Sequence, residues 1–337
     1  MRAVTTIGDN RVDVREHAAP EPGPGDVRVR VHGAGLNRAD LIQRLGLYPA
    51  PPGSPPDIPG LEFAGVVDAV GAGAAFAIAD RVFGIAGGGA QAELLVVPAE
   101  HCARVPGHLD LVAMGGVPEA FVTAHDAMVT RARLRRGEWV MIHAVGSGVG
   151  TAALQLAKAL GGRVVGTART QEKLERCRAL GLDVAIVPPR RPARPDGTDD
   201  GTLDVGGLAE LARAATDGGV DVTLDLVGGD YVTASVLAAA PKGRIVLIGT
   251  LAGGRADLPI LSVMQQRIEI HGTVLRPRDR AEKASATTAF VDDVVPLLAG
   301  GTVEPVIEAV LPLADAGAAY DLLASDATFG KIVLDCR

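Results

Sequence analysis

The chain of 337 residues is poor in cysteine and in aromatic side chains, and it has no long apolar run. Its three cysteines, Cys102, Cys177 and Cys336, are too few and too far apart for a disulfide framework or a metal-ligand pair. No stretch approaches the roughly eighteen consecutive apolar residues of a transmembrane helix, and the first residues alternate like a strand instead of forming a signal peptide. We therefore expect a cytoplasmic protein that does not enter a membrane.

Positive charge is also in the minority. The net charge of −7 and the pI near 5.5 argue against a general nucleic-acid binder. Apolar residues make up 47% of the chain and charged residues 22%, so a full hydrophobic core can form. This length and composition predict a globular protein of about two domains.

The first third of the chain has the pattern of short β-strands separated by glycine and proline. Residues 26–31 alternate between apolar and polar side chains, as a half-buried strand does. Residues 66–70 and 91–97 are further strand candidates. This part predicts a β-barrel with few helices.

From Trp139 onward, predicted strands alternate with predicted helices. An apolar strand at 139–143 precedes a helix at 151–160, and a strand at 163–168 precedes a helix at 171–180 that Thr170 is suited to cap. More strand candidates follow at residues 184–187, 220–226 and 244–248. Repeated βαβ units predict an α/β fold with a doubly wound parallel sheet, the Rossmann arrangement.

The remaining segments define the domain boundaries. Residues 188–202 are rich in proline, arginine and aspartate, and predict a mobile surface insertion. Beyond residue 267 we expect a strand at 269–274, a long helix at 281–298 and a closing strand at 331–335. Because this tail is expected to return to the barrel, the predicted domains are 1–121 together with 268–337, and 122–267.

A glycine-rich turn follows the strand at 139–143 and opens the next helix. Glycine lets a backbone turn tightly against a pyrophosphate, whose charge is favoured by the free N–H groups of a helix N-terminus. In this strand–turn–helix context the turn predicts a dinucleotide site formed by Gly146, Ser147, Gly148, Val149 and Gly150.

The end of the following strand indicates which dinucleotide is bound. NAD sites usually have an acidic residue there, whereas this chain has Arg169, with Lys173 one turn into the helix. Both side chains suit a 2′-phosphate. NADPH is therefore the predicted cofactor, and the alternative is that Arg169 is a solvated surface residue.

Five segments resemble the zinc-independent NADPH:quinone oxidoreductases of the medium-chain dehydrogenase/reductase superfamily, and most of all the p53-inducible quinone oxidoreductase group. They are residues 35–48, 59–65, 80–84, 117–124 and 275–278. The resemblance implies a GroES-like catalytic barrel beside the Rossmann domain, with the nicotinamide in an interdomain cleft. It also implies reduction of quinones by hydride transfer from NADPH.

The same resemblance makes two positions informative about zinc. Zinc alcohol dehydrogenases of this superfamily have a cysteine where Asn37 stands and a histidine where Leu61 stands. Zinc needs three or four N, S or O ligands at suitable spacing. No metal is therefore expected.

Three residues are implied as catalytic, each with an alternative. Tyr48 would donate to the acceptor or stack on it, or it packs beside the neighbouring prolines. Asn37 would face the nicotinamide, or it holds its own loop by hydrogen bonds. Thr123 would lie near the nicotinamide, or its hydroxyl caps backbone. Glu119 is interpreted as a first-turn helix acid rather than a catalytic acid.

Three further residues are candidates for binding the cofactor. Gly249 and Leu251 follow a strand at the sheet edge where ligands bind in such folds. Lys331 would reach a cofactor phosphate, or simply begins a strand. The resemblance implies a homodimer and a small-molecule quinone or enone substrate. The alternatives are reduction of an activated C=C bond, as in an alkenal or enoyl thioester, and a binding role without catalysis.

Overall fold

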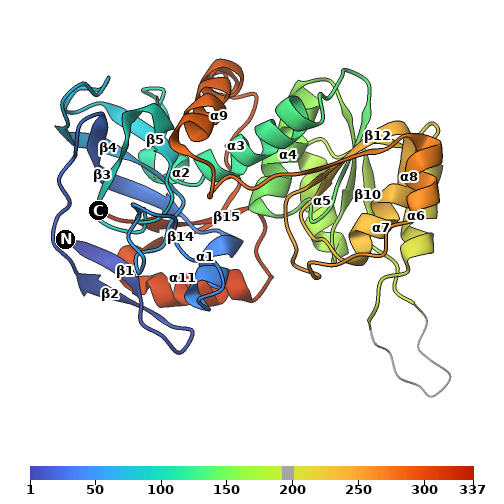
Figure 1. The fold of residues 1–337 in the computed structure, drawn as a ribbon, viewed down its shortest axis with the longest axis horizontal. Helices are drawn as coiled ribbons and strands as arrows, with labels where there is room; N and C mark the ends of the chain where they lie inside the picture. Colours follow the sequence, from blue (N-terminus) through green and yellow to red (C-terminus); the bar gives the residue numbers. More distant parts are fainter. Residues whose placement is uncertain (192–200) are drawn as a thin grey trace. The chain divides into compact units, whose positions relative to one another are not determined.

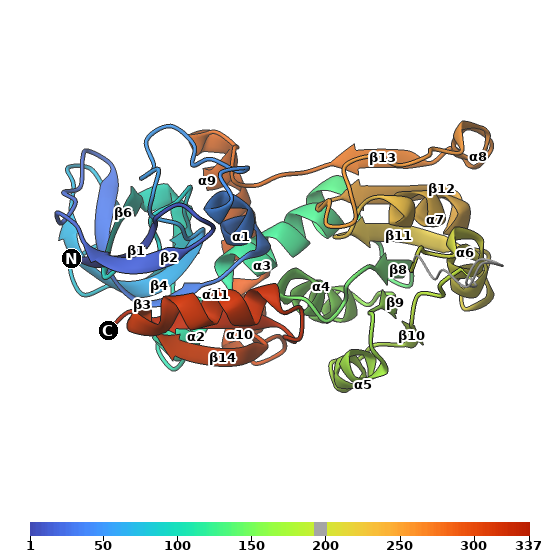
Figure 2. The ribbon, with the colours of Figure 1, turned by 90° about the horizontal axis from the view of Figure 1, so that it is seen from below.

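The computed structural model describes residues 1–191 and 201–337, so residues 192–200 of the predicted insertion lie outside the described chain. The chain forms two compact units (Figures 1 and 2). Unit 1 contains Met1–Thr123 and Leu275–Arg337, and unit 2 contains Ala124–Val274. The first unit is therefore built from two separate parts of the chain.

Unit 2 is an α/β domain around a six-stranded sheet in which every strand pair is parallel. The strand order is β10-β9-β8-β11-β12-β13, which Figure 2 shows along the edge of the sheet. The strands are β8 (Trp139–Ile142), β9 (Arg163–Thr167), β10 (Val184–Ile186), β11 (Val220–Asp225), β12 (Ala239–Leu247) and β13 (Glu269–Gly272). The order reverses direction beside β8, as in the predicted doubly wound sheet.

Helices connect these strands. They are α4 (Gly148–Ala159), α5 (Gln171–Ala179), α6 (Val205–Ala214), α7 (Asp230–Ala238) and α8 (Ile260–Gln266), after a π-helical turn at Asp126–Arg131. Helix α5 begins as predicted, because the Thr170 hydroxyl accepts a hydrogen bond from the Lys173 N–H at 3.4 Å. Apolar side chains of α6 and α7 pack on β8, β9 and β10, and bury one face of the sheet.

Unit 1 is the predicted β-barrel domain. Its main sheet has the order β14-β15-β3-β4-β5-β7, and β6 also pairs with β3. The strands are β1 (Arg2–Thr6), β2 (Val12–Glu16), β3 (Asp26–Gly35), β4 (Glu62–Val70), β5 (Arg81–Ile85), β6 (Leu94–Pro98), β7 (Cys102–Arg104), β14 (Ile307–Pro312) and β15 (Lys331–Asp335). The helices are α1 (Arg38–Arg44), α2 (Leu111–Met114), α3 (Pro118–His125), α9 (Arg280–Asp293), α10 (Val295–Ala299) and α11 (Ala316–Ala324).

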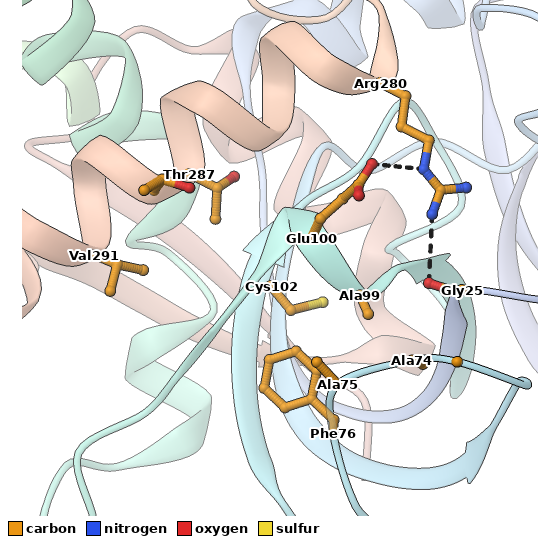
Figure 3. Close-up of a pocket in the computed structure, with 12 residues that line it drawn as sticks. Gly25, Ala74, Ala75, Phe76, Ala99, Glu100, Cys102, Arg280, Thr287 and Val291 are labelled. Carbon is orange, nitrogen blue, oxygen red and sulfur yellow. Dashed lines mark hydrogen bonds and ion pairs between the residues drawn. The ribbon is translucent and has the colours of Figure 1, made fainter.

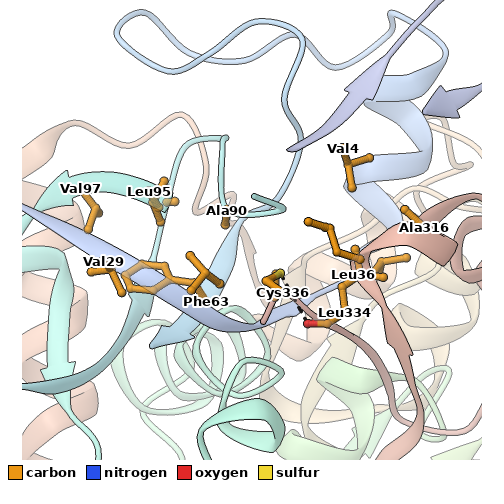
Figure 4. Packing of buried hydrophobic residues seen from close by; sticks show 14 of the residues in the cluster. Val4, Val29, Leu36, Phe63, Ala90, Leu95, Val97, Ala316, Leu334 and Cys336 are labelled. Atoms are coloured by element: carbon orange, nitrogen blue, oxygen red, sulfur yellow. Dashed lines mark hydrogen bonds between the residues drawn. The ribbon is translucent and has the colours of Figure 1, made fainter. Parts of the chain in front are cut away.

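The core of unit 1 draws side chains from both parts of the chain. Figure 4 shows Phe63 and Val29 from the N-terminal strands in the same cluster as Leu334 and Ala316 from the C-terminal segment. Leu36, which is 2% exposed, belongs to this cluster and directly precedes Asn37. The core thus fixes the chain next to a predicted site residue.

Two expectations about the C-terminal segment need correction. Residues 268–274 were assigned to the barrel, but β13 pairs with β12 and therefore belongs to the sheet of unit 2. The predicted helix at 281–298 is two helices, α9 and α10, which separate at Val294. Pro296 in the first turn of α10 explains the break, since proline has no N–H and its ring clashes with the preceding turn.

Candidate functional site

The glycine-rich turn of unit 2 has the geometry expected for binding phosphate. The Ser147 hydroxyl accepts a hydrogen bond from the Gly150 N–H at 3.1 Å and caps α4. A Cβ atom on Gly150 would lie 2.5 Å from the Ala144 carbonyl oxygen, so no other residue fits there without a shift. The turn therefore ends at a helix N-terminus, where the first N–H groups lack intrahelical partners.

The other predicted cofactor residues of unit 2 follow two strands of the same parallel sheet. Arg169 follows β9, Lys173 lies in the first turn of α5, and Gly249 follows β12. Gly249 is packed so closely that an added Cβ would lie 2.5 Å from the Leu226 carbonyl oxygen, whereas Leu251 is 57% exposed. Because parallel strands end at the same edge of a sheet, the fold brings these residues to the edge that carries the glycine-rich turn.

In unit 1, a buried carboxylate at the start of β4 is the centre of a dense set of contacts. Glu62 is fully buried, and its Oε1 forms an ion pair with Lys331 Nζ at 2.5 Å and accepts a hydrogen bond from Asn37 Nδ2 at 3.0 Å. Its Oε2 accepts the backbone N–H of Glu119 at 2.9 Å. Burying a carboxylate is costly unless it is paired and hydrogen-bonded, and Glu62 is both.

The contacts of Lys331 argue against its predicted role. Its ammonium group also donates to the Leu36 carbonyl oxygen at 2.6 Å and to Asn37 Oδ1 at 2.7 Å. An ammonium has three N–H donors, of which Leu36 and Asn37 accept two, and the Glu62 carboxylate pairs with its charge. The ammonium is buried and its charge is already paired, so we assign Lys331 to the charge pair with Glu62 and not to a cofactor phosphate.

Asn37 holds its own loop, as its alternative interpretation predicted. It caps α1, where its backbone N–H donates to Asp40 Oδ2 at 2.7 Å. Asp40 is itself fully buried and also accepts from Gln91 Nε2 at 3.2 Å, and burial raises the pKa of its carboxyl to about 6. Tyr320 donates to Gln91 Oε1 at 2.9 Å and extends this polar network.

Tyr48 is fixed by a residue that the sequence analysis did not assign. Arg276 is 3% exposed and donates to the Tyr48 carbonyl oxygen at 2.9 Å, to Gln43 Oε1 at 2.6 Å and to the Gly87 carbonyl oxygen at 2.8 Å. Its guanidinium carbon also lies 4.8 Å from the centre of the Tyr48 ring. Arg276 lies in the segment 275–278, one of the five segments that carry the family resemblance. Its place in that segment is the sequence feature that could have marked it as a site residue.

Helix α3 carries Thr123 and Glu119 one turn apart. Residues separated by four positions lie on the same face of a helix, and both side chains are partly exposed. Burial and the nearby Glu62 carboxylate raise the pKa of Glu119 to about 8. Burial, and next the charge of Glu119, raise the pKa of Tyr48, so Tyr48 and Glu119 interact electrostatically.

A cavity of about 400 Å³ lies elsewhere in unit 1 (Figure 3). Helix α9 and the barrel line it, and Arg280 of α9 pairs with Glu100 at 2.6 Å across its rim. None of the predicted site residues contributes to its lining. The candidate site therefore rests on the side-chain network around Glu62 and Tyr48, and on the turn of unit 2.

A catalytic zinc does not fit the residues of unit 1. Asn37 and Leu61 provide neither thiolate nor imidazole, and the Glu62 carboxylate is already paired with the Lys331 ammonium. Among the residues described, no group of three or more His, Cys, Asp and Glu side chains is arranged to hold a metal ion. The described helices also include none long and apolar enough to cross a membrane.

Comparison with known proteins agrees with this architecture. The family model of the alcohol dehydrogenase GroES-like domain matches residues 23–107, and that of the zinc-binding dehydrogenases matches residues 148–291. A quinone oxidoreductase of Pseudomonas aeruginosa is 32% identical over 332 residues, which cover 97% of this chain and 96% of the relative. The chain belongs to the medium-chain dehydrogenase/reductase superfamily and is an oxidoreductase of that superfamily.

Other relatives differ in activity and in size. A 2-haloacrylate reductase of a Burkholderia species is 32% identical and covers 93% of this chain and 91% of the relative. The pikromycin polyketide synthase component PikAII of Streptomyces venezuelae is 39% identical over 69% of this chain, but the match spans only 6% of that protein. These relatives establish the family but not one substrate.

Solved structures include relatives that use either cofactor. The quinone oxidoreductase of Thermus thermophilus, solved also with NADPH, aligns with a TM-score of 0.80 at 30% identity over 99% of this chain and 100% of that one. An NAD-dependent alcohol dehydrogenase aligns with a TM-score of 0.82 at 31% identity over 99% of both chains. The fold is thus shared by relatives whose structures are described with either cofactor.

Proposed function

We propose that this protein reduces quinones with NADPH and without zinc. The observation that carries the proposal is the pairing of Lys331 with Glu62 and Asn37, which leaves no ligand set for a Lewis-acid metal. An acceptor must then be electrophilic by itself, and a quinone is, because conjugation spreads the incoming charge. The quinone oxidoreductases of Pseudomonas aeruginosa and Thermus thermophilus support this substrate class.

NADPH would be held by unit 2. The turn from Gly146 to Gly150 would hold its pyrophosphate at the N-terminus of α4, and Arg169 and Lys173 would offer cationic donors to its 2′-phosphate. Gly249 and Leu251 would lie beside its nicotinamide. When bound, the cofactor supplies hydride. The role of the protein is to orient the acceptor against Tyr48 and to exclude water.

A second candidate reaction is reduction of an activated C=C bond. The 2-haloacrylate reductase relative supports it, since haloacrylates carry such a bond.

We also propose a homodimer formed through the free edge of β13. This strand pairs only with β12 among the described strands, and α8, which packs on β12, exposes Ile260, Leu261 and Met264.

The test of this function is NADPH oxidation with 9,10-phenanthrenequinone by EDTA-treated protein, compared with a 2-haloacrylate and crotonyl-CoA. We expect EDTA-resistant turnover with the highest kcat/KM for the quinone. A much higher kcat/KM for either C=C substrate would instead establish the second candidate. NADPH binding without turnover of any acceptor would favour a role without catalysis.

The cofactor preference is tested with Arg169→Ala. We expect the Kd for NADPH to rise about 10- to 100-fold while the Kd for NADH changes little, since a charge-assisted hydrogen bond contributes about 1.5–3 kcal/mol. Arg178→Ala is the matched control, because Arg178 is an exposed arginine near the other end of α5. Fluorescence titration of both cofactors gives the values. Equal weakening of NADPH and NADH would remove Arg169 from the 2′-phosphate site.

A further inference from the structure

Three acidic side chains lie close to one another in unit 1, and they differ in their access to a ligand. Asp40 and Glu62 are fully buried, whereas Glu119 keeps part of its side chain exposed. A group that exchanges a proton with a substrate must reach the surface of its site. Of the three, Glu119 alone meets this condition.

The three acids also differ in the number of hydrogen-bond donors that reach their carboxyl groups. Glu62 pairs with the Lys331 ammonium and accepts from Asn37 and the Glu119 backbone, and Asp40 accepts from Asn37, Gln91 and Gly60. Within the described parts of the chain, the Glu119 carboxyl has no hydrogen-bond donor at bonding distance. The Lys331 ammonium is thus paired with Glu62. Because Glu119 has no such partner, its neutral, protonated form is favoured.

The charged groups with the largest effects on Glu119 lie on four elements of unit 1. Glu62 on β4 and Asp40 on α1 raise the pKa of the Glu119 carboxyl, whereas Lys331 on β15 and Lys283 on α9 lower it. Burial is the largest cause, and the result is a pKa of about 8. Glu119 also interacts with two further groups, Tyr48 and Arg276. It is therefore coupled to the residue proposed to contact the acceptor.

We propose that the Glu119 carboxyl is the proton store of the site and supplies the proton that neutralises the reduced acceptor. This rests on the proposed function. The acceptor gains two electrons and one hydrogen as hydride from NADPH, and becomes an anion. The O–H bond of Glu119 breaks and an O–H bond forms on the reduced quinone. The Glu119 carboxylate then regains a proton from solvent.

The acid strengths fit this direction of transfer. A hydroquinone anion is a phenolate, and the phenol of tyrosine has a pKa of about 10. A carboxylic acid with a pKa of about 8 is a stronger acid than that, so the proton moves downhill to the anion. It is also largely protonated at pH 7, as a general acid must be.

The experiment is a pH profile of kcat/KM for 9,10-phenanthrenequinone at saturating NADPH, from pH 6 to 10. For the wild type we expect a plateau at low pH and a decline above pH 8, because deprotonated Glu119 has no proton to give. For Glu119→Gln we expect kcat/KM about 100-fold lower at pH 7 and no such decline. Glu119→Asp should keep a decline, since it keeps an acid.

Two controls separate this role from a structural one. Glu210→Gln removes an exposed carboxylate of α6 and should match the wild type at every pH. The Kd for NADPH and the melting temperature of Glu119→Gln should stay near the wild-type values. A wild-type pH profile and rate in Glu119→Gln would overturn the proposal while leaving quinone reduction intact.

A second measurement does not depend on turnover. Infrared difference spectra of wild type minus Glu119→Gln should contain a protonated-carboxyl C=O band at pH 7 that disappears around pH 8. Absence of that band at pH 7 overturns the proposal. If the band is present but the wild type reduces no acceptor, the proposed function fails and the proton donation fails with it.

Discussion

Replacing Lys331 with methionine is expected to lower the free energy of unfolding by about 3–5 kcal/mol, the cost of breaking a buried ion pair by removing one partner. The variant leaves the fully buried Glu62 carboxylate without its cation and removes a donor from Asn37 and from the Leu36 carbonyl oxygen. Urea denaturation followed by far-UV circular dichroism measures the change.

Two comparisons make this result specific. The double variant Lys331→Met with Glu62→Gln removes both charges and should recover much of the lost stability. Lys158→Met breaks the Lys158–Asp183 pair, which has a distance of 2.7 Å but is about one third exposed, and should cost less than about 1 kcal/mol. Equal losses for Lys331→Met and Lys158→Met would show that the buried pair contributes no more than a surface pair.

Replacing Arg276 with methionine is expected to lower kcat/KM for the acceptor by about 100-fold and to leave the Kd for NADPH near the wild-type value. Three hydrogen bonds and the contact with the Tyr48 ring are lost together, so the loop that carries Tyr48 is no longer fixed. A small displacement of a positioning group can cost about two orders of magnitude in rate. Steady-state kinetics and cofactor titration separate the two quantities.

Matched variants identify what Arg276 contributes. Arg276→Lys keeps the charge but not the planar fork, and should recover only part of the activity. Arg280→Met, at an exposed arginine four residues later, should behave as the wild type. Tyr48→Phe keeps the ring and the backbone carbonyl of residue 48 and removes only the phenolic hydroxyl group. If Arg276→Met retains full kcat/KM, the arginine does not position the acceptor loop.

Local sequence patterns predicted most of the elements of this fold. The strand at Lys331–Asp335 has the predicted bounds, and α5 begins at Gln171 after the predicted cap. Such features depend on neighbouring residues, namely apolar periodicity and a capping hydroxyl. The assignment of β13 failed because its partner β12 is set by the tertiary fold, which periodicity does not encode.

The candidate site was predictable only in part, for the same physical reason. The glycine-rich turn is a local motif, and its geometry follows from residues 144–150. The contact of Arg276 with Tyr48 joins residues 228 positions apart, and the contact of Lys331 with Leu36 spans 295 positions. Composition and spacing contain no signal for such pairs. The loop role of Asn37 depends on such long-range contacts, since Asn37 bonds to Glu62 and to Lys331.

The position of β15 has a consequence for the order in which this protein can fold. It lies inside the sheet of unit 1, between β14 and β3, although it is the last strand of the chain. During synthesis, β3 and the buried acid Glu62 emerge long before their partners in β15, and all of unit 2 is made in between. Closing so long a loop is slow and entropically costly. Unit 2 can therefore fold on the ribosome before β15 has been synthesised, whereas unit 1 cannot complete its sheet until then.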